Sequence, residues 1–265
     1  MTDPQHTDYP EEPQDFEVIE SERDRGGNRH RGVYLLPNLI TTAALFAGFY
    51  AILAAMNGMF VHAAVAIIVA GILDGMDGGI ARLTNTQSRF GAEYDSLSDC
   101  VAFGVAPGLV AYAWALSELG NFGRAAAFLY VACAALRLAR FNVQAASSDK
   151  RFFTGLPSPS GAGLVATMVW LGASRGVDGT EIGIIVALLT AAAGLLMVSS
   201  IRYHSFKEFR IGKVPFRVLL GAIVAFAIVF LDPPLVLLSV ALAYVASGPL
   251  LWALRLRRVR AKRGN

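Results

Sequence analysis

Long apolar stretches alternate along the chain with short polar clusters, and each stretch approaches the ~20 residues that an α-helix needs to cross a bilayer. The stretches lack the strict alternation of apolar and polar positions that is typical of a membrane β-barrel. Only helices and closed barrels satisfy their backbone hydrogen bonds in lipid, so the pattern predicts an all-α, polytopic membrane helix bundle. We expect eight transmembrane helices, at about residues 36–56, 60–83, 95–117, 122–143, 157–174, 181–200, 214–231 and 234–255.

The composition agrees with a lipid environment. The chain has 265 residues, of which 55% are hydrophobic and only 16% charged, and its mean hydropathy is +0.50. A soluble domain usually carries about 25% charged residues, so the composition argues against a soluble protein. The first thirty residues have no apolar core, and we therefore expect no signal peptide.

The basic residues fall almost entirely on one side of the predicted membrane domain. With eight spans both termini lie on the same side, and 21 of the 23 Lys and Arg residues fall there. Only Arg124 and Arg175 fall on the other side. Because cytoplasmic loops carry an excess of Lys and Arg, this asymmetry predicts a multi-pass protein of the cytoplasmic (inner) membrane with both termini in the cytoplasm.

Two polar tails flank the predicted membrane domain, which covers residues 33–255. Residues 1–32 are rich in Pro, Glu, Asp, Gln, Arg and Gly, a composition that predicts a disordered cytoplasmic tail. Residues 256–265 form a basic cytoplasmic tail. Next to a membrane span, such a tail indicates contact with anionic lipid headgroups, and we expect no nucleic-acid partner.

Four aspartates cluster at the predicted cytoplasmic ends of the second and third spans. Asp74 and Asp77 are three residues apart and share one helix face, and Asp95 and Asp99, four apart, share a face of the next helix. The polar connection 84–93 lets the two pairs oppose each other. Each charge at membrane depth costs roughly 2.5 kcal/mol or more, and divalent cations offset this cost. The pattern therefore predicts two Mg²⁺ or Mn²⁺ ions on the four carboxylates.

Such a site fits chemistry on a nucleotide-activated substrate. Two ions side by side can clamp a pyrophosphate for in-line displacement at phosphorus. Arg82 lies on the same helix stripe as Asp74 and would hold phosphate oxygens, while Gly78 and Ala81 leave room for a nucleotide. Ion pairing with Arg82 and Arg89 is an alternative, but two arginines cannot neutralise the four aspartates together with Glu93. A membrane cation or solute transporter stays open as a different class of function.

The spacing D-x2-D-G-x2-A-R-x8-G-x3-D-x3-D, which runs from Asp74 to Asp99, is similar to the signature of the CDP-alcohol phosphotransferase family. Eight fixed positions over 26 residues make this resemblance specific. It implies that Asp74, Asp77 and Asp95 ligate metal and that Asp99 is the general base and a further ligand. The residues expected to contact the CDP moiety are Gly78, Ala81, Arg82, Ser88, Gly91, Asn38 and Thr41. A helix cap explains Asn38 and Thr41 equally well.

Segments within 90–107, 137–142 and 155–159 resemble the multi-span bacterial branch of the family that makes phosphatidylserine. The resemblance implies metal-dependent transfer of a phosphatidyl group from CDP-diacylglycerol to L-serine, with release of CMP, by a homodimer. Glycerol 3-phosphate, an inositol phosphate or choline remain alternative acceptors. A polyprenyl-type transferase with aspartate-rich metal sites fits the spacing less well.

Serine is a zwitterion, so its recognition needs a cationic side chain. Arg137 and Arg140 lie three residues apart near the cytoplasmic end of the fourth predicted span and are the expected acceptor-binding residues. Anchoring of the span by positive charge explains the two arginines equally well. Asn142 and Ser158 are the expected polar contacts to the acceptor.

Overall fold

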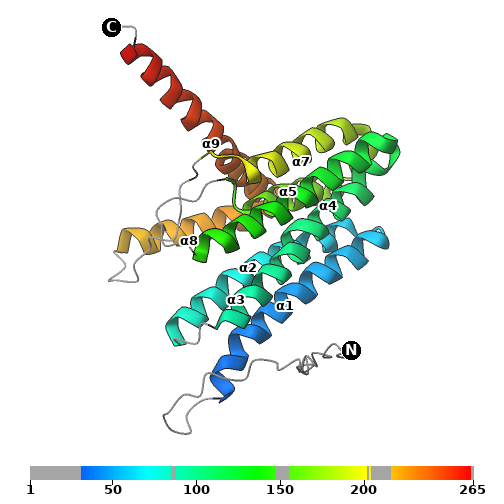
Figure 1. Cartoon of the computed structure of the whole chain (residues 1–265). Coiled ribbons are helices and arrows are strands. Elements are labelled where there is room, and N and C mark those ends of the chain that lie inside the picture. The colour runs from blue at the N-terminus through cyan, green and yellow to red at the C-terminus, as the bar shows by residue number, and fades with distance from the viewer. Residues whose placement is uncertain (1–30, 85–87, 147–154, 202, 204–215, 264–265) are drawn as a thin grey trace, which may run out of the picture. The chain divides into compact units, whose positions relative to one another are not determined.

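The computed structural model describes residues 31–84, 88–146, 155–201, 203 and 216–263 (Figure 1). The chain divides into two units, Met1–Arg31 and Gly32–Asn265, and apart from the first residue of α1 every helix below lies in the second. All elements of the described residues are helical, which confirms the predicted all-α class. The predicted tail 1–32 falls outside the described residues except for its last two, which begin α1.

In chain order the elements are α1 (Arg31–Met56), α2 (Phe60–Thr84), α3 (Arg89–Asp99), the π-helical turn η1 (Cys100–Val105), α4 (Ala106–Ala111), the π-helical turn η2 (Tyr112–Leu116), the 3-10 turn η3 (Ser117–Leu119), α5 (Gly120–Ala146), α6 (Ser158–Ser174), the 3-10 turn η4 (Gly179–Ile182), α7 (Gly183–Val198), α8 (Phe216–Leu231) and α9 (Pro233–Arg263). Each predicted span therefore falls on helix wherever the structure describes it, except for Pro157, Ser199 and Ser200 at span ends. Residues 256–263, predicted as a tail, continue α9.

A reversal at Gly120 divides the longest apolar helical segment into two arms. Elements α3 to η2 run on without a break as one arm, and α5 folds back against η1, α4 and η2 (Figure 1). Gly120 has φ 58°, in the left-handed region that favours glycine. The segment Phe90–Val143 thus supplies the two helices predicted at 95–117 and 122–143.

In the described residues, five helical segments are long and apolar enough to cross a membrane: Leu36–Met56, Phe60–Ile80, Phe90–Val143, Gly179–Val198 and Pro233–Leu254. The apolar part of α8, Val218–Leu231, is shorter. Helix α6 has 17 residues, the lower limit of the range of about 17–25 that spans a bilayer. The protein is an integral membrane protein, and the count of eight spans and the side of the termini stay predictions.

Small side chains let α1, α2 and the α3–η2 arm approach closely. An added Cβ at Gly48 of α1 would lie 2.7 Å from the Cα of Ala102 in η1. Ala51, Ala63 and Ala70 on the same surfaces have no exposed area at all. Lipid offers helices little hydrophobic drive to associate, so close contact between small residues is what stabilises such packing. The C-terminal half of α2 also lies close to α3, where two of the predicted aspartates lie.

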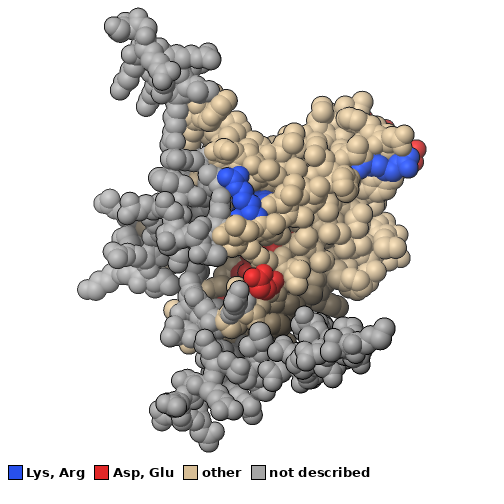
Figure 2. Space-filling view, in the orientation of Figure 1, with Lys and Arg blue, Asp and Glu red and all other residues tan. Residues whose placement is uncertain are grey.

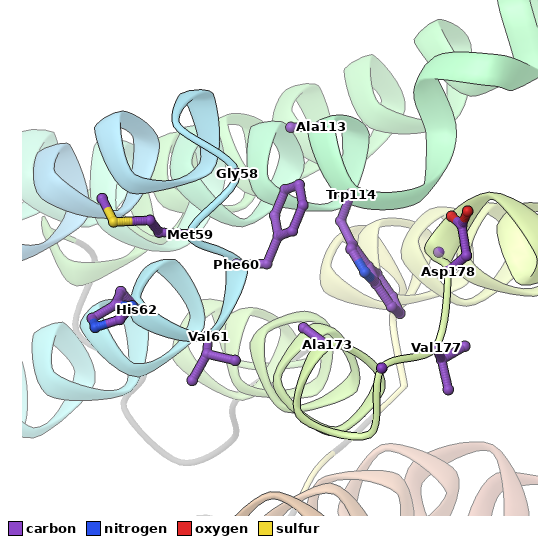
Figure 3. A pocket seen from close by; sticks show the side chains of 12 residues that line it. Gly58, Met59, Phe60, Val61, His62, Ala113, Trp114, Ala173, Val177 and Asp178 are labelled. Atoms are coloured by element: carbon purple, nitrogen blue, oxygen red, sulfur yellow. The ribbon is translucent and has the colours of Figure 1, made fainter.

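Trp114 of η2 packs at the other end of α2, beside Phe60 and the connection that follows α6 (Figure 3). An added Cβ at Gly172 or Gly179 would overlap its indole ring. Trp114 is itself only 5% exposed. These two glycines therefore let the ring join η2 to α6 and η4.

Helix α9 packs mainly along α6 and touches α8 less extensively. At its start, Asp232 pairs with Arg175 at the end of α6. This contact joins one end of α6 to the α8–α9 corner. Along α6 the same packing brings α9 to the side of the molecule that holds the acidic residues described next.

Candidate active site

Three carboxylates converge where α2 and α3 lie side by side. Asp74 of α2 and Asp95 and Asp99 of α3 each place one carboxylate oxygen within 4.8 Å of the others. All three side chains are half-buried. On the face shown in Figure 2, acidic side chains gather in a hollow of an otherwise largely uncharged surface. The structure thus brings together three of the four predicted metal ligands.

The fourth predicted ligand, Asp77, lies outside this cluster. Its side chain is only 5% exposed and accepts a hydrogen bond of 2.6 Å from the hydroxyl of Thr41 in α1. The same hydroxyl lies 3.1 Å from the carbonyl oxygen of Pro37. Ser98 of α3 in turn donates to the carbonyl of Thr41, at 3.2 Å. Thr41, predicted to contact the nucleotide, is thus buried and ties α1 to both neighbouring helices.

The donor set suits a hard divalent cation. Carboxylate oxygens are the preferred ligands of Mg²⁺ and Mn²⁺, and three of them already converge. Their mutual repulsion in a half-buried position is offset by a cation between them. Arg137 of α5, which lines the same cavity, interacts electrostatically with Asp99 and offsets part of the repulsion. The cluster is therefore consistent with a metal site.

The carboxylates open into a cavity of about 610 Å³. Its far walls come from α5, α6 and α9, which contribute Arg137, Ser158 and Tyr244. Much of the remaining lining is apolar, with Leu237 and Val240 from α9 among it. A cavity with one charged wall and one apolar wall suits a ligand that has a charged head and an apolar tail.

Two of the predicted acceptor-binding residues meet in this cavity. The Nη1 of Arg137 donates to the hydroxyl of Ser158 at 2.7 Å. Ser158 is fully buried in the first turn of α6. The Nε of Arg137 is buried and has no hydrogen-bond partner among the described residues. The intrachain bonds therefore leave part of the donor capacity of this guanidinium unused.

The other two predicted acceptor-binding residues do not line the cavity. Arg140 donates from Nη1 to the carbonyl of Val198 at the end of α7, at 3.4 Å. Asn142 accepts from the hydroxyl of Ser96 at 2.9 Å and donates to Glu93 at 3.3 Å. These bonds tie α5 to α7 and α3, which is a structural use of both side chains.

The predicted nucleotide-binding residues lie around the same ends of α1, α2 and α3. Gly78 is exposed, and an added Cβ there would meet nothing within 4 Å, so intrachain packing does not require glycine. At Gly91 a Cβ would lie 3.0 Å from Ser88 Oγ and 3.2 Å from Asn38 Oδ1. Ser88 caps α3 by accepting from the Gly91 N–H. The side chains of two further predicted contacts lie outside the described residues: Ala81 and Arg82.

Sequence reasoning missed the contribution of α9. Tyr244 lies about 145 positions beyond the aspartates and inside an apolar run, so its spacing from the motif carries no signal. The one local sign is its phenol group, since Tyr in an apolar run carries a hydroxyl that seeks a hydrogen-bond partner. Only the packing of α9 on α6 shows that this hydroxyl belongs to the cavity.

A second cavity, of about 590 Å³, lies at the other end of α2 (Figure 3). His62 and Asp178 are its titratable groups. Asp178 accepts from the backbone N–H of Thr180 at 3.0 Å and from its hydroxyl at 2.8 Å, and these bonds hold the pKa of Asp178 below its usual range. This carboxylate caps η4. The cluster of acidic side chains that could hold a metal ion lies in the first cavity instead.

The chain is similar in sequence to known proteins. The profile of the CDP-alcohol phosphatidyltransferase family matches residues 34–196. A CDP-diacylglycerol–serine O-phosphatidyltransferase of Helicobacter pylori is 42% identical over 179 residues, which are 67% of this chain and 75% of that protein. A protein of the same name from Mycobacterium tuberculosis is 34% identical over 232 residues, or 84% and 80% of the two chains. One from Bacillus subtilis is 36% identical over 174 residues, or 65% and 92%.

Proposed function

The chain belongs to the CDP-alcohol phosphatidyltransferase family, and from this premise we propose that it transfers a phosphatidyl group from CDP-diacylglycerol to L-serine. The products are phosphatidylserine and CMP. The observation that carries the chemistry is the convergence of Asp74, Asp95 and Asp99 in a cavity whose far wall holds Arg137. The acceptor follows from the shared name of the relatives.

The donor binds at the ends of α2 and α3. Asp74, Asp77, Asp95 and Asp99 hold two divalent ions, Mg²⁺ or Mn²⁺. When bound, such ions neutralise the pyrophosphate and favour in-line displacement at phosphorus. The guanidinium of Arg82 steadies the phosphate oxygens. The residues expected to lie against the nucleotide are Gly78, Ala81, Ser88, Gly91 and Asn38.

Asp99 is the general base. It interacts electrostatically with Arg137, which lines the same cavity and is proposed to bind the acceptor. Asp99 takes the proton of the serine hydroxyl while that oxygen bonds to phosphorus. The bond between the same phosphorus and the CMP oxygen breaks, and CMP leaves with the electron pair. Arg137 and Ser158 hold the acceptor in place.

The membrane setting of the reaction is part of the same proposal. The apolar wall of the cavity, which includes Leu237 and Val240, receives the acyl chains of the donor. The site faces the cytoplasm, where serine is available and CMP is released. Eight spans within the domain 33–255, cytoplasmic termini and a homodimer complete the proposal.

The direct test is CMP release by the purified protein in detergent, with CDP-diacylglycerol, Mn²⁺ or Mg²⁺, and one acceptor at a time. We expect release with L-serine and loss of at least a thousandfold in Asp74→Asn, because one fewer carboxylate holds the cations. Glu181→Gln, at an exposed carboxylate of η4, is the matched control and should retain full activity. Asp99→Asn should lose turnover but keep binding of CDP-diacylglycerol.

Other results would separate the alternatives. Release with glycerol 3-phosphate, an inositol phosphate or choline, and none with serine, would keep the reaction type and replace the acceptor. No release with any acceptor, by a protein that still binds Mn²⁺, would favour transport of a cation or solute. Equal activity in Asp74→Asn and the wild-type protein would remove the acidic cluster from the mechanism.

A further inference from the structure

We infer that Tyr244 of α9 selects the acceptor: its phenol hydroxyl and Arg137 together bind the carboxylate of an α-amino acid. The inference deepens the proposed function and rests on it. It assigns acceptor choice to a helix outside residues 34–196, the part of the chain that the family profile matches. A neutral or cationic acceptor such as choline would gain nothing from this pair of donors.

The face of α9 that lines the cavity points to this role. Leu237, Val240, Ala241 and Tyr244 all line it, and they follow the i, i+3, i+4, i+7 spacing of one helix stripe. Three of these side chains are purely apolar. Tyr244 is the fourth and brings the only hydrogen-bonding group of the stripe, so the hydroxyl has a defined place at one end of an otherwise apolar wall.

The charges around Tyr244 indicate what it binds. Arg137 and Tyr244 line the same cavity, and Arg137 also interacts electrostatically with Asp99, the proposed base. An acceptor whose hydroxyl reaches Asp99 therefore places its other polar groups near Arg137 and Tyr244. A guanidinium fork and a phenol hydroxyl are both hydrogen-bond donors that suit a carboxylate. L-Serine carries a carboxylate two bonds from the carbon that bears its hydroxyl, which fits this order of groups.

The ring of Tyr244 is held in place from behind. It packs against Tyr203 with the ring centroids 5.6 Å apart and the planes tilted by 42°. Tyr203 donates to the carbonyl of Val245 at 3.1 Å, and an added Cβ at Gly248 would overlap its ring. A donor fixed by packing loses little freedom on binding a ligand, which is what a specificity-determining group requires.

Tyr244→Phe tests the inference, because it keeps the ring and removes only the hydroxyl. With CDP-diacylglycerol and Mn²⁺ present, we expect the KM for L-serine to rise about tenfold, the size of one lost hydrogen bond to a charged group. The KM for CDP-diacylglycerol and kcat should stay within about twofold. Tyr50→Phe removes a phenol hydroxyl from an exposed position on α1 and should leave both KM values unchanged.

Two results would overturn the inference. One is an unchanged KM for serine in Tyr244→Phe. The other is an equal rise in both KM values, which would mean that the substitution alters the shape of the cavity as a whole. Binding of CDP-diacylglycerol to the variant, measured without acceptor, checks that the cavity is still formed. The proposed function is tested separately: it fails if the wild-type protein releases no CMP with serine.

Discussion

The hydroxyl group of Thr41 orients the carboxylate of Asp77 through a hydrogen bond. Asp77 is buried between α1 and α2, and its carboxylate would lose most of its hydration without a compensating donor. The hydroxyl of Thr41 supplies that donor at 2.6 Å. Groups that orient a metal ligand in this way commonly change metal affinity by about 10–100-fold when removed. Thr41 is therefore a positioning residue for a proposed ligand.

Thr41→Val keeps the shape of the side chain and removes the hydroxyl. We expect the concentration of Mn²⁺ that gives half-maximal activity to rise about tenfold, because Asp77 is no longer oriented. Titration of CMP release with Mn²⁺ measures the effect. Thr41→Ser retains the hydroxyl and should stay close to wild type. An unchanged Mn²⁺ requirement in Thr41→Val would show that this hydrogen bond does not matter to the site.

Sequence spacing predicted that four aspartates meet, and the structure brings together three of them, Asp74, Asp95 and Asp99. Asp95 and Asp99 share a face because four residues complete about one helical turn, and Asp74 opposes them across a short connection. The bond of Asp77 to Thr41 joins residues 36 positions apart, and spacing within one helix carries no information about it. Arg140 is likewise engaged by the end of α7, far along the chain.

At the scale of elements, the Trp114 contact holds together three parts of the chain that are distant in sequence. The indole packs against α6 at Gly172 and against η4 at Gly179, with Phe60 of α2 nearby (Figure 3). Glycine in an exposed helix costs stability, but here it makes room for a large ring that is almost fully buried. A substitution that fills the space of either glycine should therefore lower the stability of the folded protein.

Gly172→Ala would force its new methyl group into the indole ring. Overpacking of this kind costs about 1–3 kcal/mol, and we expect a lower temperature of thermal unfolding in detergent. Gly163 lies on the same helix, and a Cβ there would meet nothing within 4 Å. Gly163→Ala is therefore the matched control and should unfold at or slightly above the wild-type temperature. Equal unfolding temperatures for the two variants would contradict the proposed packing role of Trp114.

The helices themselves were predictable because runs of about 20 apolar residues admit few other structures in lipid. Every predicted span falls on helix in the described residues. The π-helical turns at Cys100–Val105 and Tyr112–Leu116 were not predicted. A π-turn is a single-residue adjustment of helix register, and apolar periodicity over so short a stretch does not show it. Helix α5 packs against both turns.

At the scale of the whole molecule, metal binding and folding should be coupled. The three carboxylates repel one another when no cation is bound, and a cation that binds the folded protein stabilises it by mass action. We expect Mn²⁺ at about 100 times its dissociation constant to add roughly 2.7 kcal/mol, which raises the unfolding temperature by several degrees. Thermal unfolding with and without EDTA measures this shift.

Asp95→Asn should lose most of the Mn²⁺-dependent shift, because it removes one of the three converging oxygens. Glu181→Gln, at an exposed carboxylate, should retain it. A shift of the same size in both variants would mean that Mn²⁺ stabilises the protein elsewhere. The sequence predicted the three carboxylates that converge, since all of them lie within 26 residues, but it did not predict that Asp77 lies apart from them. The sequence did not predict the opposite wall of the cavity, because α9 reaches the cavity only through its packing on α6.

The position of α9 has a consequence for when the enzyme first becomes active during its synthesis. The aspartates are translated in the first 100 residues, whereas Tyr244 and its neighbours on the cavity wall come from the last thirty. A nascent chain therefore holds its acidic residues long before it holds the wall that encloses them. The cavity gains this wall only when α9 has left the ribosome and packed along α6, so we expect a nascent chain that lacks α9 to have an incomplete acceptor site.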